Sequence, residues 1–104
     1  MSDGRWLVLI RSAPRELSGR EILELVLAGA SLDIGLDVVF SGPGLRHLRG
    51  NEMAGWRQLL DYDMAALWRL DASDSVARAS SGVGQIDEDA LQRMKSRAAG
   101  VLEL

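Results

Sequence analysis

The fold class of this 104-residue chain is decided by the segment RWLVLI at residues 5–10. From its tryptophan onward the segment is an unbroken run of apolar strand formers, bounded by Gly4 and Arg11, which is typical of a strand covered on both faces. Pro14 disfavours helix at the residue before it, so residues 11–14 are predicted to form a loop. A strand covered on both faces needs helices on each side, which indicates an α/β domain.

A helix is predicted after this loop, across residues 18–30. Ser18 and Glu21 have the spacing of a capping box, and the residues that follow are apolar apart from Glu24. Residues 36–40 form a second short apolar segment, so the order strand, helix, strand is complete at this point. That order predicts a βαβ unit, in which two parallel strands are joined by a right-handed crossover.

The rest of the chain alternates between helical and strand patterns in the same way. After the second strand we predict a short helix at 45–50 that Gly50 ends, a helix at 53–60 and a third strand at 65–70. A short helix capped at 71–74 and running through Ala79 follows. The chain is then predicted to form a brief strand at 83–86, a last helix from Asp87 and a strand at 101–104. We therefore predict one domain over residues 1–104, a three-layer α/β/α fold with a mainly parallel sheet of four to five strands.

The composition excludes several classes of chemistry. The chain has no cysteine, so it forms no disulfide, thiolate zinc site, iron–sulfur cluster or persulfide. His47 is the only histidine, which excludes an all-histidine metal site, and no cofactor is predicted. Lys and Arg number 12 against 15 Asp and Glu, a net charge of −3 with no basic run, which argues against direct nucleic-acid binding.

No stretch of the sequence has the pattern of a membrane or export segment. A transmembrane helix needs a run of about 18 apolar residues, and the chain has none. Residues 1–4 lack the basic region and the long apolar stretch of a signal peptide. We therefore expect a cytoplasmic protein that makes no membrane contact.

A ligand site is predicted in the loops that follow the strands, because ligands of parallel α/β sheets gather beyond the carboxyl ends of the strands. Arg11, Ser12 and Arg15 precede a helix, where cationic side chains and free backbone N–H groups can hold an anion. Ser41 begins the loop after the second strand and completes the predicted anion or ligand pocket. No G-x-G-x-x-G or Walker lysine pattern is present, and the glycines at 42–44 are more typical of a tight turn than of a phosphate cradle.

The remaining polar and aromatic residues suggest contacts rather than catalysis. No nucleophile and base are visibly paired, so we predict no catalytic residue and no enzyme. His47 suits a proton shuttle, but a lone histidine on a short helix without a nearby carboxylate is more typically structural. Trp56 is either core or an interface anchor, and Trp56, Tyr62 and His47 are our candidate interface residues.

Several segments together resemble the DsrE/DsrF/TusC-like family of sulfur-relay proteins, most closely its DsrF/TusC branch. The similar segments, in chain order, are residues 9–14, 19–24, 27–33, 38–40, 44–45, 47–50, 61–64, 67–68, 74–76 and 87–104. They resemble the family's first strand with its Ala-Pro or Gly-Pro loop, its first helix, its second strand and turn, the segment leading into its third strand with the helix that follows, and its final helix and strand. The resemblance implies the family's flavodoxin-like fold.

The resemblance also implies a subunit that packs with cysteine-bearing relatives in a sulfur-transfer complex serving sulfur oxidation or tRNA thiolation. Members that carry sulfur have a cysteine just after the third strand, where this chain has residues 70–72, LDA. Three further features differ from the family pattern. The acidic residue of the family's turn is replaced near Pro43, its glutamine is replaced near His47, and the region 50–60 is shorter than in the family's long members.

Two functions follow from these observations. The first is a non-catalytic sulfur-relay subunit that assembles with DsrE-like and DsrH-like (TusD-like and TusB-like) chains and supports a partner's cysteine. The second is a self-assembling module of the same fold that binds a small molecule or an anion and transfers no sulfur. In both, the chain is expected to form a homo- or hetero-oligomer.

Overall fold

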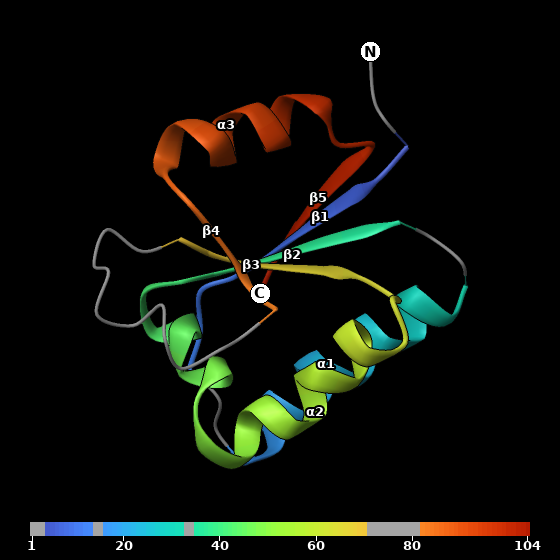
Figure 1. The fold of residues 1–104 in the computed structure, drawn as a ribbon, viewed down its shortest axis with the longest axis vertical. Helices are drawn as coiled ribbons and strands as arrows, with labels where there is room; N and C mark the ends of the chain where they lie inside the picture. The colour runs from blue at the N-terminus through green and yellow to red at the C-terminus, as the bar shows by residue number, and fades with distance from the viewer. Residues whose placement is uncertain (1–3, 14–15, 33–34, 71–81) are drawn as a thin grey trace.

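Five parallel strands form one sheet in the computed structural model, which describes residues 4–13, 16–32, 35–70 and 82–104 (Figure 1). The strands are β1 (Trp6–Ile10), β2 (Leu36–Ser41), β3 (Ala66–Leu70), β4 (Gly84–Ile86) and β5 (Gly100–Glu103). Their order across the sheet is β4-β3-β2-β1-β5, and every pair is parallel. The prediction of a mainly parallel sheet of four to five strands is confirmed.

Helices cover the two faces of the sheet unequally. The helices of the described residues are α1 (Glu16–Ser31), the 3₁₀ helix η1 (Gly42–Leu48), α2 (Gly50–Asp61) and α3 (Glu88–Arg97). Figure 1 shows α1 and α2 side by side below the sheet and α3 above it. We call these two sides the α1/α2 face and the α3 face. The three-layer α/β/α architecture predicted from the sequence is therefore confirmed.

Strand β1, which lies between β2 and β5, sends alternate side chains into two separate cores. Val8 and Ile10 belong to the larger core, which includes residues of α1 and α2. Leu7 and Leu9 belong to the smaller core, together with Leu91 of α3. Because successive strand residues point to opposite faces, an unbroken apolar run is what a strand covered on both faces requires.

Two local predictions were wrong. The helix α1 begins at Glu16, so Ser18 lies inside it and is not its cap; an acidic residue followed by leucine begins a helix well. Gly50 begins α2 instead of ending the helix before it. The extended backbone of Arg49 separates α2 from η1, whose start has a proline in its first turn. The predicted short helix from residue 71 through Ala79 lies outside the described residues.

The C-terminus of α2 closes with a Schellman motif that uses aspartate in place of glycine. The backbone N–H of Met64 donates to Leu59 O at 2.8 Å, and that of Asp63 donates to Leu60 O at 3.1 Å. Asp63 has φ of 54°, the left-handed conformation that ordinarily favours glycine. The helix predicted at 53–60 thus ends within one residue of the predicted end, and the turn leads the chain into β3.

Each edge strand of the sheet has a glycine covered by a tryptophan of the next strand. Trp6 of β1 pairs with Gly100 of β5, and Trp68 of β3 pairs with Gly84 of β4. A Cβ atom at either glycine would meet the ring of that tryptophan. An aromatic ring laid across a glycine shields the backbone of a strand that has no side chain there. The two tryptophans therefore hold the edge strands in register.

Candidate functional site

The predicted anion-binding residues lie at the carboxyl edge of the sheet. Arg11 and Ser12 follow β1 and are exposed, and Ser41 ends the neighbouring strand β2. Arg11 Nη2 lies 3.6 Å from Glu103 Oε1, and both side chains are half-exposed. The carboxylate of Glu103 therefore already neutralises part of the positive charge of Arg11 that would attract an anion. Arg15 lies outside the described residues, and the anion pocket stays a prediction.

His47 and Trp56 belong to the core, not to the surface. Each is 1% exposed, and their rings meet edge to face with centroids 5.6 Å apart. Phe40 completes the cluster, with its ring centroid 4.9 Å from that of Trp56. His47 Nε2 lies 2.9 Å from the backbone oxygen of Ser12. Because a carbonyl oxygen only accepts, that nitrogen is the donor. Of the three candidate interface residues only Tyr62, 77% exposed, offers its side chain to solvent.

Arg69 is a buried charged residue that the sequence analysis did not single out. It lies in β3 on the α1/α2 face, in register with Phe40 of β2, and is 1% exposed. A signal was present in the sequence, since Arg69 follows the buried Leu67 by two residues and must therefore share its face. The arginine thus belongs to the interior at the carboxyl edge of the sheet.

A second polar cluster lies at the opposite, amino edge of the sheet, on the α3 face. Arg5, just before β1, donates from Nε to Asp37 Oδ2 at 2.9 Å. Trp68 of β3 donates from Nε1 to Asp37 Oδ1 at 3.2 Å. Arg5 Nη2 also donates to Leu36 O at 2.8 Å. Asp37 is thereby held between the guanidinium of a residue just before β1 and the indole of a residue of β3, the two strands that flank β2.

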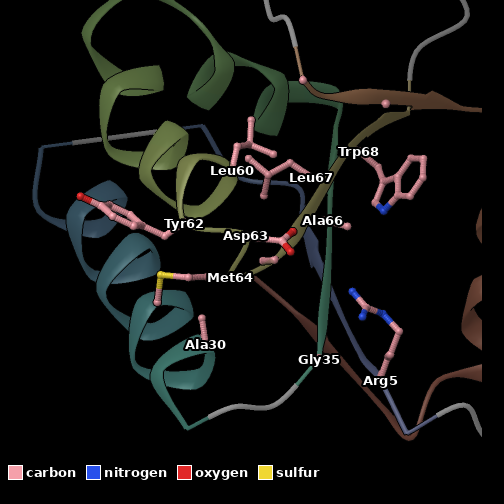
Figure 2. A pocket seen from close by; sticks show the side chains of 13 residues that line it. Arg5, Ala30, Gly35, Leu60, Tyr62, Asp63, Met64, Ala66, Leu67 and Trp68 are labelled. Atoms are coloured by element: carbon pink, nitrogen blue, oxygen red, sulfur yellow. The ribbon is translucent and has the colours of Figure 1, made fainter.

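Two cavities adjoin this cluster and share Arg5 and Trp68. The larger, of about 820 Å³, extends past the Tyr62–Met64 turn toward α2. In Figure 2 the guanidinium of Arg5 and the indole nitrogen of Trp68 point toward one another across one end of it. The smaller, of about 400 Å³, lies between the sheet and α3. The amino edge of the sheet therefore has two cavities beside polar side chains, which neither the composition nor the motif spacing had indicated.

Within the described ranges no three His, Asp or Glu side chains gather as metal ligands would. In the same ranges, no helix has both the length and the apolar character needed to cross a bilayer. No family model and no curated protein matches the chain. The resemblance to the DsrE/DsrF/TusC-like family therefore stays a prediction from residue patterns.

Replacing Asp37 by alanine is expected to lower the free energy of unfolding by about 2 kcal/mol, because Arg5 and Trp68 lose their shared acceptor. Urea unfolding followed by circular dichroism measures this loss. Trp68→Phe removes the indole donor, so its cost should be about 1 kcal/mol smaller in the Asp37→Ala background than in the wild type. If the costs of Trp68→Phe and Asp37→Ala simply added, that result would contradict a hydrogen bond between these two side chains.

The matched control for this prediction is Asp61→Ala. Asp61 is an exposed aspartate at the end of α2. Its removal should change stability by no more than about 0.5 kcal/mol. A loss as large as that of Asp37→Ala would show that the effect belongs to charge in general and not to the cluster.

Proposed function

We propose that the chain is a non-catalytic subunit of a cytoplasmic sulfur-relay complex, of the DsrF/TusC kind, which assembles with a cysteine-bearing chain of the same fold. The sequence has no thiol of its own, so any sulfur must be carried by the partner. The observation that carries the proposal is an exposed apolar surface at one edge of the sheet. We call it the β5-edge surface, formed by Trp6, Leu25, Val101 and Leu102.

The β5-edge surface exists because neither α1 on one face nor α3 on the other fully covers the last strand. Val101 and Leu102 point to opposite faces of β5, yet both are exposed. On the α1/α2 face a hollow of about 240 Å³ lies between Leu25 of α1 and Leu102, with Trp6 beside them. Its lining is apolar throughout. Exposed apolar side chains gathered in one place are typical of a surface that another protein covers.

The backbone of β5 supports the same conclusion. Among the described strands β5 pairs only with β1, so its second edge presents unpaired N–H and C=O groups. An edge strand of this kind is a template for a strand of another chain unless charge or proline blocks it. Its one charged residue, Glu103, faces Arg11 at 3.6 Å and is partly neutralised. A partner that lies along β5 would cover the strand edge and the apolar hollow together.

Co-expression with the DsrE-like and DsrH-like chains of the same genome tests the proposal. We expect affinity capture of this chain to retain both, and native mass spectrometry to give a hetero-oligomer of defined stoichiometry. Capture of neither relative, with this chain a clean monomer, would contradict the proposal. A homo-oligomer formed without either relative favours the second candidate, a self-assembling module of this fold that transfers no sulfur.

Charge placed on the β5-edge surface should abolish the assembly. The double variant Leu25→Glu/Leu102→Glu is expected to lower the captured fraction at least tenfold, because each carboxylate would lose its hydration on binding. Leu32→Glu is the matched control. Leu32 is 72% exposed at the end of α1 but does not line the hollow. Equal capture by the double variant and the control would remove the β5-edge surface from the proposal.

A further inference from the structure

Two exposed arginines flank the sheet-facing side of α3, beside its buried Leu91. Ala90, Arg93, Met94 and Arg97 lie on one side of the helix at intervals of three or four residues or in adjacent pairs, and the C-cap residue Ala98 follows them. All five line the cavity of about 400 Å³ between α3 and the sheet. The small alanines leave room beside the sheet, and the two arginines occupy the mouth of that space.

The charges of these two arginines are not neutralised within the described residues. Neither guanidinium makes an ion pair or a hydrogen bond with another described residue. Asp89 precedes Arg93 by one helical turn, yet the two form no ion pair. The one carboxylate in the lining, that of Asp37, already accepts hydrogen bonds from Arg5 and from Trp68. The cavity therefore has an excess of positive charge at its mouth.

The inner wall of the same cavity is apolar and held in place. Leu7 and Ile86 line it from the sheet and Met94 from α3. The indole of Trp68 lies across Gly84, and its nitrogen is anchored on Asp37 at 3.2 Å. A fixed aromatic wall loses little conformational entropy when it binds a ligand. The cavity combines an apolar interior with cationic groups at one side, as small-molecule sites do, and its volume falls within their usual range.

We propose that this cavity binds a small organic anion: Arg93 and Arg97 hold its carboxylate or phosphate group, and Trp68, Ile86 and Met94 contact its apolar, ring-sized part. Arginine suits this role because its planar guanidinium donates two parallel hydrogen bonds to a carboxylate or a phosphate. Two arginines one helical turn apart can both donate hydrogen bonds to one such group, each from a different side. The site is independent of the sulfur-relay proposal, since the chain binds this ligand by itself.

Titration by nuclear magnetic resonance with phenyl phosphate and with benzoate tests the site. Inorganic phosphate and phenol serve as probes of the acidic group alone and of the ring alone. We expect a saturable shift of the Trp68 indole N–H signal, and none of the signal of Trp56, which is buried in the other core. Both single-feature probes should bind at least tenfold more weakly. The tighter of the two ring-bearing probes identifies the preferred acidic group.

The double variant Arg93→Gln/Arg97→Gln should weaken binding of either ring-bearing probe at least tenfold. Lys95→Gln/Arg57→Gln removes the same charge from α3 and α2 outside the cavity and should bind as the wild type does. Far-UV circular dichroism checks that both variants are folded, and unaltered partner capture by the first variant separates this site from the β5-edge surface. The proposal is overturned by any of three results: no saturable shift, inorganic phosphate binding as tightly as phenyl phosphate, or equal loss in the control variant.

Discussion

Gly44→Ala is expected to lower the free energy of unfolding by about 3 kcal/mol, the upper range for overpacking. Gly44 is buried in η1, directly against the backbone at the end of β1. A Cβ atom there would meet the carbonyl oxygen of Ile10 and approach the backbone nitrogen of Arg11 to 3.3 Å. Backbone atoms of a strand that is paired on both sides cannot turn aside as a flexible side chain would. Either η1 must move away, with loss of its packing, or β1 must bend.

The matched control for Gly44→Ala is the same substitution at Gly29. In α1 a Cβ atom at Gly29 would make an ordinary contact with Leu36 Cδ1 at 3.6 Å. Alanine is the better helix former, so Gly29→Ala should raise the free energy of unfolding by up to about 1 kcal/mol. Chemical denaturation followed by tryptophan fluorescence measures both variants. Equal effects of the two substitutions would show that Gly44 is not at a close approach.

Trp56→Ala is expected to lower the free energy of unfolding by about 4 kcal/mol, because it opens a large void in the principal core. Trp56 is 1% exposed and meets Phe40 and His47 edge to face. Its loss also leaves the His47 ring with one aromatic neighbour instead of two. Since domains have only about 5 to 15 kcal/mol of stability, the variant should be close to unfolding at room temperature.

Trp6→Ala is the matched control for Trp56→Ala, because it removes a tryptophan that is only partly buried. Trp6 is 43% exposed at the sheet edge, so its removal should cost less than half as much as that of Trp56. Thermal unfolding followed by far-UV circular dichroism is the suitable measurement, because each variant loses a fluorophore. A similar loss for the two variants would contradict the assignment of Trp56 to the core. That assignment corrects the sequence-based alternative of an interface anchor.

The sequence predicted the elements well because each has a pattern that local physics produces. The unbroken apolar run at residues 5–10 marks a strand buried on both faces, and it became the second strand from the β5 edge, between β2 and β5. The last helix was predicted from Asp87, and Asp87 is the N-cap of α3, where its side chain accepts a hydrogen bond from the Ala90 backbone at 2.8 Å. Acidic residues in the first turn of α3 and basic residues in its last turn suit the helix dipole. The predicted helix boundaries were wrong at two positions: Ser18 lies inside α1 instead of capping it, and Gly50 begins α2 instead of ending the helix before it.

The candidate sites were predicted less well because they depend on register between distant strands. Asp37 lies 32 residues after Arg5 and 31 residues before Trp68, and nothing local connects the three. The parallel register that pairs Leu7 with Asp37 and Val39 with Trp68 places all three on the α3 face. General rules for parallel sheets direct attention to the opposite edge, where Arg11 and Ser12 lie.

By itself the sequence determined the order of strands and helices, the α/β class and the absence of any thiol chemistry. These properties follow from residue identity and from periodicity along the chain, which act over a few residues. Only the tertiary structure decided that His47 and Trp56 are core, that Leu102 is exposed and that Arg93 and Arg97 border a cavity. Burial depends on which elements cover which face, and a strand at the sheet edge beyond the reach of α1 stays open whatever its hydrophobicity.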